Sequence, residues 1–160
     1  MKNIIALCEP EIPSNTGNIA RTSVLTGSRL ELIGPLGFSL EDKYLKRAGL
    51  DYWPELDIGL WENLDAFKPY LAEKAQEGYQ IIYATTHGAQ TTGDLQVTGP
   101  CLLLFGKETA GLPKDFIAEH PDRCWRIPMI HHHTRSLNLS NSAAILLYEV
   151  LRQQGFPELS

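Results

Sequence analysis

Short apolar runs alternate with helical patterns along this chain, and that alternation limits the folds open to it more than any other feature. Five runs are too brief for helices and are expected to form strands at residues 4–8, 30–33, 81–84, 101–105 and 124–128, with a weaker sixth at 56–59. Helices are expected from Ser14 or Asn15 to about Leu25, and at 40–48, 62–77, 114–119 and 140–154. The alternation predicts an α/β fold with a mostly parallel sheet and helices on both faces.

Length and composition are typical of one globular domain spanning residues 1–160. Hydrophobic residues make up 43% of the chain and charged residues 21%. The longest apolar run is far shorter than the roughly 20 residues that cross a bilayer, and acidic residues follow the apolar start too soon for a signal peptide, so a cytoplasmic protein is expected.

Three cysteines, each beside an apolar run, predict buried free thiols. The net charge of −5 argues only weakly against RNA, because RNA binding needs only a local basic surface.

Small polar residues open the first predicted helix, in the segment PSNTGNIART at 13–22. Backbone N–H groups at a helix start can bind an anion, so this segment could hold a phosphate or a ribose. An ordinary helix, capped by Ser14 or Asn15 and stopped at Gly27, is the alternative. Arg21 favours the binding role, because it lies one to two turns into the helix.

Two more polar segments follow predicted strands. The strand 101–105 ends at Gly106, with Glu108 close behind, and ligands of open α/β sheets bind at the carboxyl ends of strands. Gly106 would let a ligand approach the backbone closely, although a plain glycine-rich turn is also common there. The last strand leads through IPM at 127–129 to RSLNLSNS at 135–142, which has more amides and hydroxyls than helix capping requires.

A basic segment and a histidine run have two interpretations each. Lys43, Lys46 and Arg47 have aromatic neighbours, and cations with aromatics can bind phosphates and unpaired bases. A solvated helix face is the alternative. The three adjacent histidines at 131–133 cannot all reach one ion from regular structure, so an exposed loop is expected there and no metal site is predicted.

The last predicted helix is apolar on two sides. One stripe at helical spacing consists of Ala143, Leu146, Leu147, Val150 and Leu151. Ile145 and Tyr148 lie outside it. A helix with two apolar sides usually packs against two partners, so the second side predicts a homodimer; a fully buried helix in a monomer is the alternative.

Together the segments 15–22, 105–113 and 127–141 resemble, in order, the motifs of the SPOUT class of RNA methyltransferases. The likeness runs from about residue 3 to 157 and includes EPEIP at 9–13 and RAGLDY at 47–52, which match the small tRNA enzymes that methylate the ribose of the wobble nucleotide. The resemblance implies a C-terminal trefoil knot, S-adenosyl-L-methionine as cofactor, no metal, and an obligate homodimer with the last helix at its interface. The implied substrate is the wobble cytidine or modified uridine in a tRNA anticodon stem-loop.

The resemblance also implies the residues of the site. Those expected to bind S-adenosyl-L-methionine are Ala84, Thr85, Gly106, Glu108, Ile127, Pro128, Met129, Ser136 and Leu137. The expected catalytic set is Arg21 with Asn15, Glu108 and Asn141. The cations expected to contact RNA are Arg21, Lys43, Lys46, Arg47 and Arg135.

The family makes Arg21 a base or an activator. Because the pKa of arginine is about 12.5–13.8, we favour a guanidinium that stabilises the developing alkoxide and holds the adjacent phosphate bidentately.

Two other functions remain open from the sequence. The segment SNTGN at 14–18 resembles the phosphate loop of flavodoxin-like, FMN-binding electron carriers, and the length and acidity of the chain also fit them. Arg21 and the two later motifs would then have no role. The other alternative is an RNA-binding module without catalytic activity.

Overall fold

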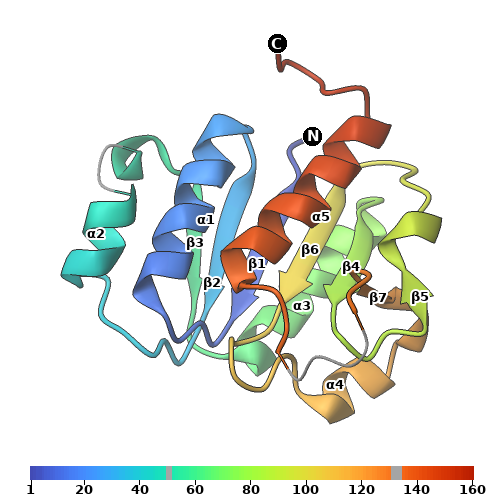
Figure 1. The fold of residues 1–160 in the computed structure, drawn as a ribbon, viewed down its shortest axis with the longest axis horizontal. Coiled ribbons are helices and arrows are strands. Elements are labelled where there is room, and N and C mark those ends of the chain that lie inside the picture. The colour runs from blue at the N-terminus through green and yellow to red at the C-terminus, as the bar shows by residue number, and fades with distance from the viewer. Residues whose placement is uncertain (50–51, 131–134) are drawn as a thin grey trace.

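A single parallel sheet runs through the computed structural model, which describes residues 1–49, 52–130 and 135–160 (Figure 1). The strands are β1 (Ile4–Cys8), β2 (Arg29–Ile33), β3 (Ile58–Trp61), β4 (Gln80–Ala84), β5 (Gln90–Thr91), β6 (Cys101–Phe105) and β7 (Cys124–Arg126). Their order is β3-β2-β1-β6-β4-β7-β5, and every pairing between them is parallel. All carboxyl ends therefore lie along the same edge of the sheet.

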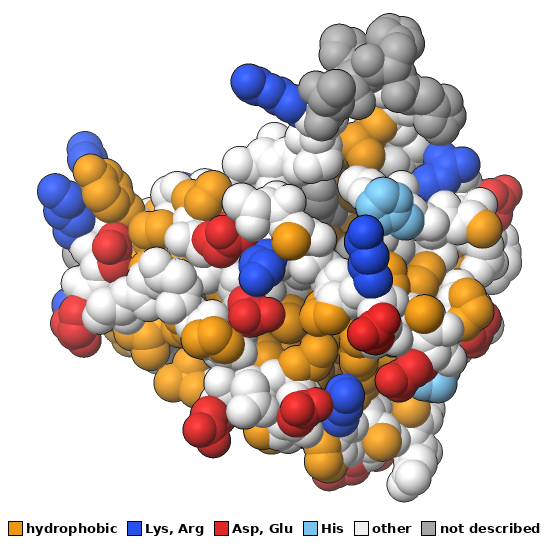
Figure 2. All heavy atoms as spheres, turned by 90° about the horizontal axis from the view of Figure 1, so that it is seen from below, with side chains coloured by type: hydrophobic (Ala, Val, Ile, Leu, Met, Phe, Trp, Pro, Cys, Tyr) orange, Lys and Arg blue, Asp and Glu red, His pale blue; other side chains and the backbone are white. Residues whose placement is uncertain are grey.

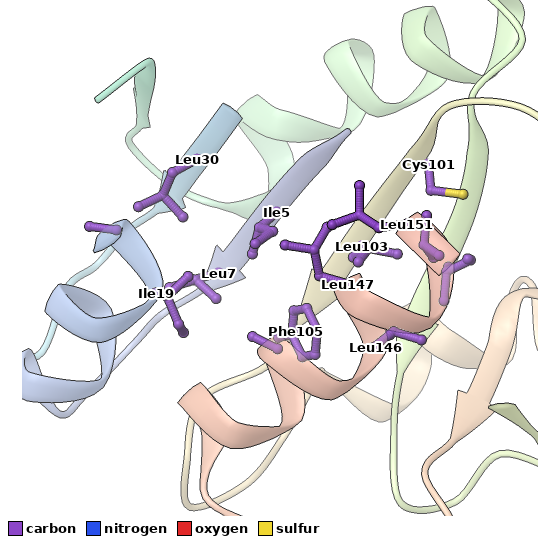
Figure 3. Packing of buried hydrophobic residues seen from close by; sticks show 14 of the residues in the cluster. Ile5, Leu7, Ile19, Leu30, Cys101, Leu103, Phe105, Leu146, Leu147 and Leu151 are labelled. Carbon is purple, nitrogen blue, oxygen red and sulfur yellow. The ribbon is translucent and has the colours of Figure 1, made fainter. Parts of the chain in front are cut away.

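Helices cover both faces of the sheet. They are α1 (Pro13–Leu25), α2 (Lys43–Gly49), α3 (Leu64–Gln76), α4 (Lys114–Ala118) and α5 (Leu139–Gln153). Successive strand residues point to opposite faces, so Ile5 and Leu7 pack with α1 and α5, whereas Ile4 and Ala6 pack with α3 and α4. Figure 3 shows the first of these two clusters, in which Leu147 of α5 lies against β6. The predicted fold class of a parallel sheet between two helix layers is confirmed.

The predicted strands are confirmed in place, with small differences at their ends. β1 and β6 have the predicted bounds, because they are continuous apolar runs buried on both faces. β7 ends at Arg126 rather than at residue 128. Pro128 has no N–H to donate to a neighbouring strand, which explains the earlier end. The weak strand predicted at 56–59 lies at Ile58–Trp61, and β5 was not predicted because both of its residues are polar.

The start of α1 differs from the prediction, whereas its end agrees with it. Pro13 is the first helical residue, and the cap position is held by Ile12, which has no side chain able to cap. The prediction of Ser14 or Asn15 as the cap is therefore wrong. Proline suits the first helical position, since its φ is already fixed and no intrahelical donor is lost. At the other end Gly27 has a φ of +64°, and the N–H of Ser28 donates to the carbonyl of Ser23 at 2.8 Å, which ends the helix as predicted.

The structure also settles several smaller points. The three cysteines are free and buried, as predicted, and burial raises the pKa of Cys8 and Cys101 to about 12. Within the described residues, no helix is both long enough and apolar enough to cross a membrane. The histidine loop at 131–133 lies outside the described residues, and so does part of the path that the expected trefoil knot would take.

Candidate active site

An open cavity of about 640 Å³ lies at the carboxyl ends of β4, β6 and β7. The first turn of α1 and the start of α5 complete its wall, with Ile12, Asn15 and Asn138. Figure 2 looks onto this edge of the sheet from below, where apolar surface lies among scattered charged side chains. The volume is within the usual range for small-molecule sites. The cavity also lies where β6 separates β1 from β4 in the sheet order, which is the kind of position where open α/β sheets bind ligands.

Most of the side chains expected to bind a cofactor line this cavity. They are Ala84, Thr85, Gly106, Glu108, Ile127, Met129, Ser136 and Leu137. Pro128 is placed elsewhere, in a shallow groove beside Ile145 and Tyr148 on the outer side of α5. Three stretches of chain that are distant in sequence therefore meet around one space.

Gly106 has a packing role in addition to the one expected. A Cβ at this position would lie 2.0 Å from the carbonyl carbon of Gly111 and 2.1 Å from the backbone nitrogen of Leu112. The loop after β6 folds back over Gly106, and an antiparallel bridge between Lys107 and Gly111 closes it. The glycine is thus required by the close approach of the loop to itself. Gly106 also lines the cavity, so the expectation that a ligand approaches its backbone stays a prediction.

Glu108 joins this loop to the start of α1. Its carboxylate accepts hydrogen bonds from the backbone N–H of Glu11 at 2.8 Å and of Ile12 at 3.0 Å, and from Nδ2 of Asn15 at 3.3 Å. A carboxylate at a helix N-terminus is favourable, because the N–H groups there have no intrahelical acceptor and the helix dipole is positive at that end. Glu108 therefore acts as the cap that the side chain of Ile12 cannot provide.

Asn15 is held from two sides. It donates to Glu108, and its Oδ1 accepts from Nδ2 of Asn138 at 2.9 Å. The other end of the Asn138 side chain caps α5, accepting from the backbone N–H groups of Ser140 at 2.8 Å and Asn141 at 3.3 Å. The chain of bonds from Glu108 through Asn15 to Asn138 thus fixes all three polar segments relative to one another.

The sequence predicted Asn141 in the site and not Asn138. The structure places Asn138 in the cavity wall, whereas Asn141 is not among the described residues that line it. The signal was present, since both asparagines belong to the polar run at 135–142. The pattern could not show which of two amides three residues apart faces α1.

The charge of the cavity is opposite to that of the whole chain. The cations along its wall are Lys107, Lys114, Arg126 and Arg135. Glu108 is the one carboxylate among the described lining residues, and its negative charge is already bound by N–H donors. A cavity with four cations in a chain of net charge −5 favours an anionic ligand.

The remaining predicted cations lie away from the cavity. Arg21 is exposed on α1, with its guanidinium carbon 5.1 Å from the centre of the Tyr52 ring. Lys43, Lys46 and Arg47 are exposed on α2, which packs closely against α1. Arg21 is six residues beyond Asn15, so it lies roughly 9 Å farther along the helix.

Within the described residues, no group of three or more histidine, cysteine, aspartate or glutamate side chains could hold a metal ion.

The sequence model of the SpoU rRNA Methylase family matches residues 2–148. This chain belongs to that family. The flavodoxin-like alternative is therefore wrong, and the structure gives a physical reason. Gly17 lies inside α1, where a Cβ would be 2.4 Å from Cβ of Ala48, so the glycine serves helix packing rather than a phosphate loop.

Relatives of this SpoU-family chain match it over nearly its whole length. The tRNA (cytidine(34)-2'-O)-methyltransferase of Methylovorus glucosotrophus is 46% identical over 95% of this chain and 96% of its own. A Geobacillus stearothermophilus protein that provisionally carries the same name is 49% identical over 98% of each chain.

Solved structures of RNA methyltransferases are similar to this chain in fold. One, described as giving structural insights into the 2-OH methylation of C/U34 on tRNA, has a TM-score of 0.85 and 38% identity, and covers 96% of this chain and 97% of its own. The SpoU methyltransferase AviRb from Streptomyces viridochromogenes, in complex with the cofactor AdoMet, has a TM-score of 0.82 and 27% identity over 96% of this chain and 58% of its own.

Proposed function

We propose that this protein transfers a methyl group from S-adenosyl-L-methionine to the ribose 2′-oxygen of nucleotide 34 in tRNA, where that nucleotide is cytidine or a modified uridine. The observation that carries the proposal is the convergence of three polar segments on one cavity, fixed by the hydrogen bonds of Asn15. A relative named for this activity matches 95% of the chain, which supports the same assignment.

The cavity suits a cofactor with apolar and polar parts. Leu137 is 38% exposed although it is a leucine, and it lines the cavity beside Met129 and Ile127. Thr85 and Ser136 add hydroxyls to the same wall. We assign these side chains, with the backbone of their loops, to holding S-adenosyl-L-methionine. The bound cofactor would supply an electrophilic methyl group attached to a positively charged sulfur.

The cations of the cavity wall suit an RNA substrate. A polyanion is attracted to a cationic recess, and each phosphate contact makes binding weaker as salt increases. Arg135 and Lys107 line the cavity, and α2 carries three more exposed cations away from it. We therefore propose that the anticodon stem-loop lies across both.

For the reaction, the ribose 2′-hydroxyl must lose its proton and meet the methyl group in line. We assign the orientation of the ribose to Asn15, because Glu108 and Asn138 fix its amide. Glu108 then acts by positioning Asn15. Two contacts are expected for Arg21, one with the developing alkoxide and one with the adjacent phosphate. The bidentate contact with the phosphate suits Arg21 better, because Arg21 is exposed on α1 and lies away from the cavity.

The proposed function is tested by methyl transfer from labelled S-adenosyl-L-methionine to total tRNA, followed by mapping of the labelled nucleoside. We expect label in a 2′-O-methylated ribose at position 34. The Arg21→Ala variant should lose turnover and keep cofactor affinity. Cofactor binding without transfer to any tRNA would instead favour the RNA-binding module without catalytic activity, and label on a base would contradict the proposed reaction.

We also propose that two copies of the chain associate through α5. The inner stripe of this helix is buried, as predicted, in the first core cluster. Its outer side leaves large apolar surfaces exposed, with Ile145 at 45% and Tyr148 at 49%. Phe156, which follows the helix, is 39% exposed, and its ring centre lies 6.4 Å from that of Tyr148. A contiguous apolar patch of this kind is typical of an interface.

A further inference from the structure

Arg21 rests on an aromatic ring that none of the assignments above includes. Its guanidinium carbon is 5.1 Å from the centre of the Tyr52 ring, within the range of a cation–π interaction. Tyr52 is half-buried, and Arg21 is exposed. The ring is therefore the one partner that the described contacts give to this guanidinium, and no carboxylate of the described residues lies within 4.0 Å of it.

The ring belongs to a segment that is anchored on the core. Tyr52 precedes a short 3₁₀ helix, Trp53–Glu55, and its carbonyl accepts from the backbone N–H of Glu55 at 3.1 Å. Trp53 packs against the first core cluster, and Leu56 is buried within that cluster. Packing of these neighbours on the core therefore holds the backbone of Tyr52 in place.

A guanidinium that lies over a ring keeps its edge free for other ligands. Carboxylates and phosphates bind arginine at that edge, through two parallel N–H donors. A long side chain that is already ordered loses less conformational freedom when it binds. Because the ring contacts the face of the guanidinium, the N–H donors at its edge can still bind an anion.

The geometry points to Tyr52 as a positioning residue for Arg21. Its ring holds the guanidinium over the surface formed by α1, with the N–H edge directed to a phosphodiester of the RNA substrate. This inference rests on the proposed function for the identity of the anion. The ordering of the Arg21 side chain by the Tyr52 ring does not depend on RNA.

Two substitutions of Tyr52 distinguish the contribution of its aromatic ring from that of its hydroxyl. Tyr52→Phe keeps the aromatic face and should retain kcat/KM for tRNA within about twofold. Tyr52→Leu removes the face and should lower kcat/KM about two- to fivefold, as expected from the strength of an exposed cation–π contact, with an unchanged Kd for S-adenosyl-L-methionine. Equal losses in Phe and Leu, or no loss in Leu, would overturn the inference.

The Arg21→Ala background tests whether Tyr52 acts through Arg21. In that background we expect Tyr52→Leu to have no further effect on the Kd for tRNA. Tyr44 provides a matched comparison, because its ring contacts Lys43 instead of Arg21. The Nζ atom of Lys43 is 5.0 Å from the centre of the Tyr44 ring. The effect of Tyr44→Leu on the same Kd should be equal in the two backgrounds. A loss from Tyr52→Leu that persists without Arg21 would refute the positioning role.

A measurement without RNA keeps this test independent of the proposed function. The Nε–H resonance of Arg21 should be shifted by the ring current of Tyr52 in the wild-type protein and in Tyr52→Phe, and should return to the unperturbed position in Tyr52→Leu. If the shift is present but tRNA is not methylated, the proposed function fails and the positioning stands. If the shift is absent from the wild type, the positioning fails whatever the activity.

Discussion

The side-chain nitrogen of Asn138 donates a hydrogen bond to the side-chain oxygen of Asn15, 2.9 Å away, and this contact joins the starts of α5 and α1. The two residues are 123 positions apart in sequence. Each amide uses its other end for a second partner: Asn138 caps α5, and Asn15 donates to Glu108. One short relay of polar groups therefore holds together segments from both ends of the chain.

Asn138→Asp separates the two tasks of this side chain. Aspartate is as good a helix cap as asparagine, but a carboxylate has no N–H to donate to Asn15. We expect the free energy of unfolding to fall by about 1 kcal/mol, because buried Asn15 loses one partner, together with a three- to tenfold loss of kcat/KM. Asn138→Ala should lose about 1 kcal/mol more than Asn138→Asp, because the cap is also removed. Urea unfolding and methyl transfer measure the two effects, and full activity in Asn138→Asp would show that the relay is not needed.

Gly17→Ala tests the packing of α1 against α2. In an open helix this change would stabilise the protein by up to about 1 kcal/mol. Here the new Cβ would lie 2.4 Å from Cβ of Ala48 and 2.9 Å from the carbonyl oxygen of Leu45, so we expect destabilisation by about 1–3 kcal/mol.

The same change should weaken tRNA binding, since α2 carries exposed cations. Gly99→Ala is the matched control, because the nearest atom to its Cβ would be 3.6 Å away. Thermal unfolding of both variants measures whether only Gly17→Ala lowers the stability of the protein. A stabilised Gly17→Ala protein would mean that α2 moves freely.

How far the sequence predicts this structure depends on whether the deciding contact is local. β1 and β6 were predicted to the residue, because burial on both faces makes their sequences continuously apolar. The cap of α1 was missed, because Glu108 lies 96 residues from the N–H of Ile12 that it binds. The sequence left open whether the segment around Gly17 binds an anion, and the packing role of Gly17 was missed for a similar reason, since its neighbour Ala48 is on another helix.

In the site, too, local patterns were predicted and contacts between distant residues were not. The three polar segments were located from sequence because strand ends and helix starts are local patterns. The choice of Asn138 over Asn141, and the outward position of Pro128, depend on which face of the chain meets α1 or solvent. The two polar residues of β5 form a strand only because β7 lies beside them.

A pH dependence follows from Glu11, whose carboxylate accepts from the hydroxyl of Thr109 at 2.7 Å and from its backbone N–H at 3.1 Å. These bonds lower the pKa of Glu11 below its ordinary value of 4.5. A carboxyl with a lowered pKa in the folded state stabilises that state above its unfolded pKa, and the stabilisation disappears as the pH falls through the folded pKa.

Thr109→Val removes the hydroxyl donor and keeps the side-chain size. We expect the variant to be less stable than the wild type at pH 7, and the difference to shrink as the pH is lowered below 4.5. Thr22→Val is the control, because the Thr22 hydroxyl donates to the carbonyl oxygen of Asn18, which does not titrate. Urea unfolding at several pH values gives both differences. A Thr109→Val difference that stays constant across the range would show that Glu11 is not the acceptor responsible.

The proposed dimer predicts that a charge on the outer side of α5 will separate two copies of the chain. Ile145→Glu should reduce the mass in solution from twice 17.9 kDa to 17.9 kDa, because an unpaired carboxylate cannot be buried in an apolar interface without a large desolvation cost. Leu60→Glu is the matched control: Leu60 is 58% exposed, but it lies on the edge strand β3 at one end of the sheet, away from α5. Light scattering after gel filtration should find Leu60→Glu dimeric. If Ile145→Glu also stays dimeric, the outer side of α5 is not the interface, and its exposed apolar side chains require another explanation.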